Sequence, residues 1–190
     1  MTGATFPATV EGHTMHHAFH RHVPIFRAAG LACLLGLITL PLARSADAPP
    51  PPRLELVSTV GEIGIRQPEP ADTIGGVELR LPQNWHGIRP WLGVSALDNG
   101  TWFAGGGFIY DVKLRSNWTA TLGTGPFYYK NRHHNLGLDL EFYSFLELTH
   151  PVWHDARAGL RIGHLSNGGL GRRNPGTEDL LFVAVVPMGS

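Results

Sequence analysis

From Leu54 onward, the chain divides into segments of about ten residues that alternate between apolar and polar character. Turn-forming pieces such as Asp98-Asn99-Gly100 separate them, as expected of antiparallel strands joined by tight turns. The predicted strands cover residues 54–65, 74–81, 88–97, 101–112, 117–129, 136–149, 156–166 and 178–187. A tilted strand needs roughly ten residues to cross a bilayer, so this segment length constrains the fold more than any other feature.

The two faces of the seventh segment differ in a way that indicates a membrane. Side chains repeat every second residue along a strand, so Leu160, His164 and Ser166 share one face, and Arg157 and Arg161 share the other. Arginines inside a small soluble barrel would be costly, whereas a membrane barrel turns its apolar face to lipid and keeps polar side chains inside. The sequence therefore predicts an all-β fold, an eight-stranded antiparallel outer-membrane β-barrel over residues 54–190.

The sixth segment supplies the expected partners of these arginines. Asp139 and Glu141 alternate with leucines and are predicted to face Arg157 and Arg161 across the interior. Eight strands make the smallest barrel of the membrane class, and side chains rather than a pore fill its interior. We therefore expect a packed and partly charged interior.

The one long apolar run of the sequence lies near its beginning. Basic residues precede the apolar residues 28–42, and small residues follow up to Ala46. This order is typical of a secretory signal peptide, predicted over residues 1–46 with cleavage after Ala46, whereas a retained membrane anchor is the weaker alternative because the run is short. Met15 is an alternative start, and residues 47–53 are interpreted as a Pro-rich spacer.

Composition excludes several classes of function. The basic residues (15) equal the acidic residues (15), which argues against nucleic acid as a partner, because proteins that bind it carry a clustered basic surface. Cys33 lies in the predicted signal peptide, so the mature chain is expected to lack thiol and disulfide chemistry. The histidines of residues 13–22 lie in or before the same predicted signal peptide, which would be removed, and neither a metal nor another cofactor is expected.

Polar residues on the lipid-facing side of the seventh segment are the first candidates for chemistry. His164 and Ser166 are two apart on that face, and Glu178 begins the eighth segment. In a hairpin closed by residues 167–177, Ser166 and Glu178 are expected to lie across from one another. Most His-x-Ser pairs are incidental, but a glutamate facing lipid needs a partner to offset its desolvation. A serine nucleophile, a histidine base and an orienting acid would together form a hydrolytic triad.

The number of strands predicts which connections lie outside the cell. With both ends of the barrel in the periplasm, the connections 130–135 and 167–177 are extracellular. Four basic residues lie in them: Lys130, Arg132, Arg172 and Arg173. The outer leaflet carries lipid phosphates, so these residues are predicted to bind a substrate phosphate, and a solvated surface is the ordinary alternative.

The sequence around these candidates has the form of a family signature. Residues 164–170 are His-Leu-Ser-Asn-Gly-Gly-Leu, and residues 174–178 are Asn-Pro-Gly-Thr-Glu. Together with residues 138–142 and 146–148, they closely resemble the lipid A 3-O-deacylase (PagL) family. The resemblance is strong over roughly residues 136–187 and architectural over residues 54–135.

That resemblance implies an outer-membrane esterase of a Gram-negative bacterium that removes the 3-position acyl chain of lipid A, a part of lipopolysaccharide, without a metal or other cofactor. His164, Ser166 and Glu178 match the family's triad one by one. Asn174 matches the asparagine of its oxyanion hole. Backbone N–H groups nearby are expected as further donors, from Asn167, Gly168 and Gly169. Each such donor typically contributes ~3–4 kcal/mol.

Two other classes of function stay open at this point. A non-catalytic outer-membrane structural barrel explains the signal and the strands, but not the matched string at 164–178. A soluble periplasmic barrel that binds a lipid-like ligand would be recovered without detergent. The sequence also leaves open a homodimer and the preferred acyl chain.

Overall fold

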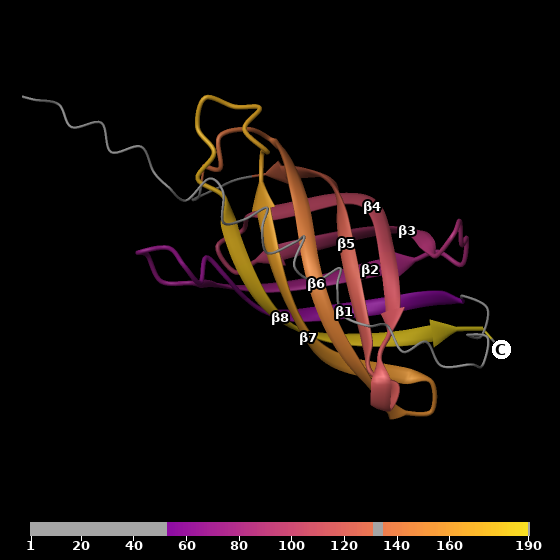
Figure 1. Ribbon diagram of the computed structural model, residues 1–190. Helices are drawn as coiled ribbons and strands as arrows, with labels where there is room; N and C mark the ends of the chain where they lie inside the picture. Colours follow the sequence, from indigo (N-terminus) through magenta and orange to yellow (C-terminus); the bar gives the residue numbers. More distant parts are fainter. Residues whose placement is uncertain (1–52, 131–134, 190) are drawn as a thin grey trace, which may run out of the picture. The chain divides into compact units, whose positions relative to one another are not determined.

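The computed structural model describes residues 53–130 and 135–189, and these form one closed barrel. Its antiparallel strands follow one another around the wall, and β1 closes on β8 (Figure 1). The strands are β1 (Leu54–Ile63), β2 (Asp72–Arg80), β3 (Ile88–Leu97), β4 (Trp102–Lys113), β5 (Thr119–Lys130), β6 (Leu140–Trp153), β7 (Ala156–Ser166) and β8 (Thr177–Met188). The predicted eight-stranded antiparallel barrel is confirmed. A 3-10 turn, η3 (Arg115–Asn117), joins β4 to β5.

Some expectations fall on other parts of the chain. The predicted signal peptide (1–46), residues 47–52 of the predicted spacer, and Arg132 lie outside the described residues. Within the described ranges, no helix is long and apolar enough to span a membrane.

The connections between strands gather at two ends of the barrel (Figure 1). One end, here called the loop rim, is formed by residues 64–71, 98–101, 135–139 and 167–176. The other end, the terminal rim, holds residues 81–87, η3, residues 154–155 and the end of β8. Odd-numbered strands therefore run toward the loop rim and even-numbered strands return from it.

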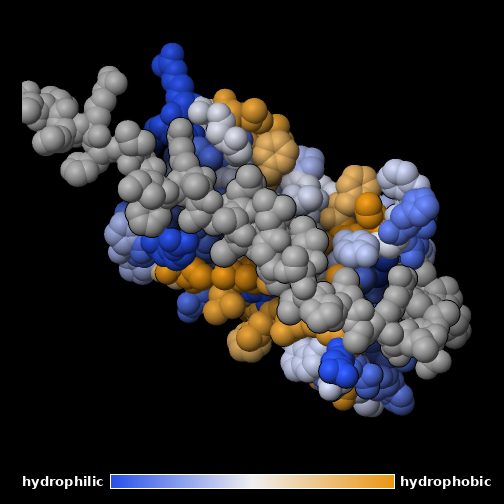
Figure 2. Space-filling model, in the orientation of Figure 1, coloured by the Kyte–Doolittle hydropathy of each residue, from blue (hydrophilic) through white to orange (hydrophobic). Residues whose placement is uncertain are grey.

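The outward face of the barrel is apolar. Phe182, Phe108 and Ile162 point outward and are 68%, 59% and 52% exposed. On the face seen in Figure 2, hydrophobic side chains gather between more hydrophilic ends. Arg157 and Arg161 are buried inside, which confirms the two faces predicted for the seventh segment. This distribution is the reverse of a soluble protein and is the one that a bilayer requires.

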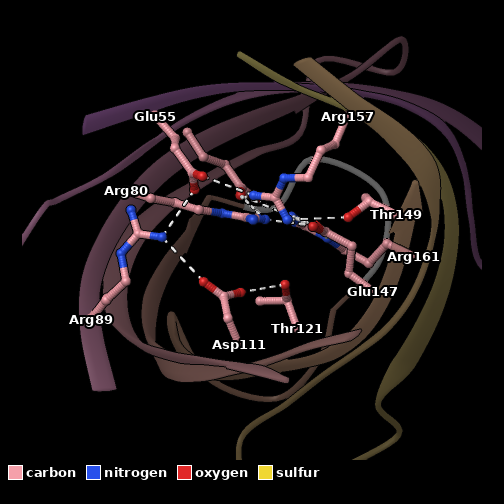
Figure 3. A network of polar contacts seen from close by, with 10 residues as sticks. Glu55, Arg80, Arg89, Asp111, Thr121, Glu147, Thr149, Arg157 and Arg161 are labelled. Atoms are coloured by element: carbon pink, nitrogen blue, oxygen red, sulfur yellow. Dashed lines mark hydrogen bonds and ion pairs between the residues drawn. The ribbon is translucent and has the colours of Figure 1, made fainter. Parts of the chain in front are cut away.

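A buried ionic cluster holds the middle of the interior (Figure 3). Arg80 and Arg161 each donate from Nη2 to Oε2 of Glu147, at 2.7 Å in both cases. Arg161 also makes a two-pronged contact with the carboxylate of Glu78. Because buried charges are tolerated only when they are paired, this cluster ties β2, β6 and β7 to one another across the interior.

A second ionic cluster lies in the same interior and centres on Glu55. Its Oε2 accepts a hydrogen bond from Arg89 at 3.1 Å, and its Oε1 accepts one from Arg157 at 2.8 Å. The predicted partners of the β7 arginines were therefore wrong. Asp139 is exposed ahead of β6, and Glu141 is buried without pairing to either arginine.

Aromatic side chains fill the interior beside these clusters. The rings of Trp91, Phe103, Phe127, Tyr143 and Phe145 pack with centroids 5.3–6.3 Å apart. The interior is thus occupied by side chains, as expected for eight strands.

The start of β6 differs from the prediction. The strand begins at Leu140 rather than at residue 136, because residues 136–138 pack on the β7–β8 connection. The carbonyl oxygen of Asp139 still accepts the N–H of Tyr129 in β5 at 2.7 Å. Gly137 has a φ of +108°, and a Cβ there would lie 2.3 Å from the carbonyl oxygen of Arg173. Only glycine combines this backbone conformation with so close an approach.

Candidate active site

His164 and Glu178 face each other on the outward side of the barrel near the loop rim. The two are direct partners in the β7–β8 ladder, and His164 Nδ1 lies 3.5 Å from Glu178 Oε1. Their side chains are 50% and 23% exposed, so both can be reached from outside the barrel wall. The expectation that Ser166 would lie across from Glu178 was wrong, because the register gives Glu178 to His164 and Ser166 lies beyond the last β7–β8 pair.

Ser166 ends β7 on the same outward face as His164. It is half-buried, and its partner in the adjacent strand is Phe142 of β6. Within the described residues, no hydrogen bond joins the Ser166 hydroxyl to the imidazole of His164. Such bonds are often long in an enzyme without substrate and shorten when the substrate binds. The structure thus brings the three predicted residues to one place and leaves Ser166 Oγ free to meet a ligand.

A second serine, which the sequence did not single out, lies beside the histidine. Ser144 of β6 is the direct partner of His164 on the side away from Glu178. Its Oγ lies 2.8 Å from the hydroxyl oxygen of Thr124, with which it shares a hydrogen bond. The Ser144 hydroxyl is therefore already hydrogen-bonded. The register of β6 against β7 would have identified this residue as a neighbour of His164.

The imidazole of His164 packs on the backbone of the β7–β8 connection. A Cβ built at Gly176 would lie 2.9 Å from His164 Cε1 and 3.4 Å from Nε2. Gly176 also has a φ of +65°, which L-residues other than Asn and Asp rarely adopt. Glycine at this position leaves room for the ring between the connection and Glu178.

Asn167 ties the β7–β8 connection to the neighbouring segment of the loop rim. Its side chain is fully buried, and Nδ2 donates to the carbonyl oxygens of Leu136 at 2.9 Å and Arg173 at 2.7 Å. Oδ1 accepts the backbone N–H of Gly169 at 3.0 Å. Every polar atom of this side chain is satisfied, so Asn167 organises the connection that follows Ser166.

The predicted oxyanion donors divide into engaged and available groups. The N–H of Asn167 donates to Asn174 Oδ1 at 3.0 Å, and the N–H of Gly169 is held by Asn167, so both are used within the connection. The N–H of Gly168 and the Nδ2 group of Asn174 have no hydrogen-bond partner among the described residues. Asn174 is exposed at the loop rim, and its Oδ1 accepts the N–H of Asn167. Its amide nitrogen is therefore left to donate to a ligand.

The predicted phosphate-binding residues are spread apart. Arg173 lines a polar pocket beside Glu178, whereas Arg172 is exposed and does not line it. Lys130 ends β5 opposite Trp102, on a different side of the rim from β8.

Arg66, which was not predicted, approaches the site from the β1–β2 connection. Its Nη1 lies 3.6 Å from the same Oε1 of Glu178 that His164 contacts. The pairing of β1 with β8 brings the β1–β2 connection to this place. The sequence could have indicated Arg66, because closure of the barrel pairs the first strand with the last and so places the first connection beside Glu178.

No metal centre accompanies these side chains in the part of the chain that the structure describes. There, no three His, Cys, Asp or Glu side chains are grouped so as to hold a metal ion.

Comparison with known proteins connects this geometry to one family. The family model described as "Lipid A 3-O-deacylase (PagL)" matches residues 73–186, from β2 into β8, and so includes His164, Ser166 and Glu178. No curated protein matches the chain.

Solved structures share its fold. The crystal structure of the outer membrane enzyme PagL superposes with a TM-score of 0.56 at 18% identity, covering 70% of this chain and 99% of that chain. Neisserial surface protein A gives a TM-score of 0.50 at 10% identity, covering 71% of this chain and 96% of that chain. A de novo designed transmembrane β-barrel gives 0.50 at 12% identity, with 75% and 100% covered. At these identities the likeness is one of fold.

The family match spans more than half of the 190 residues. With the closed barrel and its apolar outward face, it sets aside both the non-catalytic barrel and the soluble periplasmic barrel. The chain belongs to the lipid A 3-O-deacylase (PagL) family and is an ester hydrolase of the Gram-negative outer membrane.

Proposed function

We propose that Ser166, His164 and Glu178 carry out the family's reaction as nucleophile, base and orienting acid. The reaction is hydrolysis of the 3-position acyl ester of lipid A. The contact of 3.5 Å between His164 Nδ1 and Glu178 Oε1, beside a serine on the same outward face, is the observation that carries this mechanism.

Glu178 orients the base. A carboxylate beside Nδ1 keeps the proton of the neutral imidazole on that nitrogen, which leaves Nε2 as the acceptor. When Nε2 takes the proton of the Ser166 hydroxyl, the carboxylate stabilises the imidazolium that forms. Serine is a weak nucleophile without such a base.

The reaction then follows two steps. Ser166 Oγ attacks the ester carbonyl carbon, and the collapse of the tetrahedral intermediate breaks the bond to the sugar oxygen, which receives the proton from His164 Nε2. This leaves an acyl-serine. A water molecule, deprotonated by His164, attacks the acyl carbon and releases the fatty acid, and the proton returns to Ser166 Oγ. The products are the deacylated lipid and one free 3-hydroxy fatty acid.

Two donors are available for the oxyanion of each intermediate. Asn174 Nδ2 and the N–H of Gly168 are unengaged in the described structure and belong to the connection that follows Ser166. Donors aimed at a developing oxyanion typically contribute ~3–4 kcal/mol each.

An apolar surface beneath the site supports an acylated substrate. A shallow groove of about 580 Å³ runs over the outward sides of β1, β7 and β8, and Leu160 and Phe182 line it. These residues continue the outward faces that carry His164 and Glu178 toward the terminal rim. An acyl chain lying along the barrel wall would bring its ester to the level of Ser166. We further propose that the loop rim faces the cell exterior, where this lipid resides. A second copy of the chain as a partner stays a prediction.

The test compares two serines on the same face. The full chain is purified in detergent and incubated with lipopolysaccharide, and the released 3-hydroxy fatty acid is quantified. Ser166→Ala should lower the rate at least about a thousandfold. Ser144→Ala, which removes a hydroxyl from the other neighbour of His164, should stay within about twofold of the wild type. Undiminished release by Ser166→Ala would overturn the mechanism.

A further inference from the structure

A polar pocket lies at the loop rim directly beside Glu178. It has a volume of about 530 Å³. Its walls come from three connections far apart in the sequence: residues 66–69 of the β1–β2 connection, residues 135–136, and the β7–β8 connection around Arg173 and Gly176. The outward groove that we assign to acyl chains is apolar, so this pocket is a separate surface suited to the polar part of a ligand.

Hydrogen bonds between the connections hold this pocket in shape. Gln67 Nε2 donates to the carbonyl oxygen of Gly176 at 3.1 Å, and the N–H of Gly64 donates to the carbonyl oxygen of Glu178 at 2.8 Å. On the opposite wall, Asn167 bonds to Leu136 and Arg173. The pocket is therefore preformed, and a ligand does not have to order its walls.

The charges in the pocket suit a ligand that carries both an anion and hydroxyl groups. Arg66 and Arg173 supply guanidinium donors, which match the oxygens of a phosphate in pairs. Glu69 and the amide of Gln67 supply acceptors for sugar hydroxyls. A purely cationic site would favour any anion, whereas this mixture favours a sugar phosphate.

Arg66 is free to change partner. Its side chain is 76% exposed, and its contact with Glu178 is 3.6 Å long, which is a weak ion pair at such exposure. That contact uses the same carboxylate oxygen as His164. A phosphate that draws Arg66 away would leave this oxygen to the imidazole.

We propose that the loop-rim pocket binds the phosphorylated sugar of the substrate, with Arg66 and Arg173 as ligands of a phosphate monoester. This assignment rests on the proposed function, because it places the sugar beside the residues that would cleave its ester. Phosphate in the pocket and the acyl chain along the barrel wall then hold the ester between them at Ser166.

The experiment compares two lipids that differ only in phosphate. The purified full chain is given diphosphorylated lipid A or the same lipid A after removal of its phosphate groups, and kcat and KM for fatty acid release are measured. The wild type should show a KM about tenfold lower for the phosphorylated lipid. Arg66→Gln and Arg173→Gln should each remove most of this difference by raising the KM for the phosphorylated lipid toward the KM for the dephosphorylated lipid. Arg66→Lys should keep part of the preference.

The control for these variants is an arginine far from the pocket. Arg115→Gln removes an exposed arginine at the terminal rim and should leave both KM values unchanged. Equal losses on both lipids would mean that Arg66 acts only through Glu178, which overturns the proposal. Inhibition by inorganic phosphate without any effect of the lipid phosphates would identify a free-phosphate site and would also overturn it.

The outcome also separates this proposal from the triad. If Ser166→Ala stays active while the arginine effects persist, the triad fails and the pocket is supported. If the arginine variants match the wild type on both lipids while Ser166→Ala is inactive, the pocket fails and the triad stands.

Discussion

Glu178 Oε1 lies 3.5 Å from His164 Nδ1 and 3.6 Å from Arg66 Nη1, so one carboxylate oxygen serves both a candidate base and a cation. The relationship between Glu178 and His164 is fixed by the β7–β8 register, because the two residues are direct partners in the ladder. Glu178, the proposed orienting acid, is thus placed beside His164 by the sheet itself rather than by a loop.

Replacing the acid while keeping its shape should expose this role. Glu178→Gln removes the negative charge that keeps the proton on His164 Nδ1, so kcat should fall about 10²–10⁴-fold with a smaller change in KM. Release of 3-hydroxy fatty acid measures the effect. Glu62→Gln changes an exposed glutamate on the adjacent β1, whose partner in β8 is Leu180, and should leave kcat within about twofold. Equal activity of Glu178→Gln and the wild type would exclude an orienting role.

The contact between Gly176 and the imidazole predicts a second effect on catalysis. Gly176→Ala puts a methyl group 2.9 Å from His164 Cε1, so the ring must move and kcat should fall at least about tenfold. Gly169→Ala is the matched control, because Gly169 has a comparable φ of +84° but its Cβ would meet nothing within 4 Å. Both variants carry a similar backbone penalty of about 1–2 kcal/mol. A comparable loss of activity in both variants would point to backbone strain rather than to the ring.

Asn167 should be required for an ordered connection rather than for a stable barrel. Asn167→Ala leaves the buried carbonyl oxygen of Leu136 without its donor, which costs about 1–3 kcal/mol, and also removes the part-buried bond to Arg173. Limited proteolysis should then cut the β7–β8 connection, and activity should drop at least about tenfold while the barrel stays folded. Asn99→Ala removes a similar pair of bonds at the β3–β4 turn and should leave that connection protected. An Asn167→Ala protein that resists cleavage there would contradict this role.

Stability, by contrast, should depend on the interior. Glu147→Ala strips the shared acceptor from Arg80 and Arg161, and an uncompensated buried charge costs about 3–5 kcal/mol. Urea unfolding in lipid vesicles, followed by tryptophan fluorescence, measures this loss. Asp155→Ala breaks the exposed ion pair with Arg53, whose members are 67% and 44% exposed, and should cost less than about 1 kcal/mol. Similar midpoints for the two variants would show that the interior pairs add no net stability.

Strand number, strand length and the choice of faces were predictable because each depends on local alternation. Arg157 and Arg161 share a parity along β7, and that parity alone placed them inside. Their partners were not predictable in the same way. Glu78 and Glu147 reach Arg161 from β2 and β6, and which carboxylate meets which arginine depends on packing across the barrel.

The candidate site shows the same division. The spacing of His164 and Ser166 on one strand predicted that they share a face. The partner of Glu178 could not be predicted in this way, because it depends on the register of a hairpin with a long connection. The late start of β6 follows from contacts of Gly137 with Arg173, which no local pattern encodes. Arg66 reaches Glu178 only because the first strand closes on the last.

His164 and Ser166 lie on the outward side of a barrel wall whose interior is filled by side chains, so a substrate of the proposed site would arrive from the surrounding lipid. Under the proposed mechanism, the lipid reaches the site by diffusing sideways within its own leaflet, so the encounter takes place in two dimensions. Turnover should therefore follow the mole fraction of lipid A around the barrel rather than its concentration in the bulk solution. Diluting the substrate with inert lipid at constant total amount would then slow the enzyme as effectively as removing substrate.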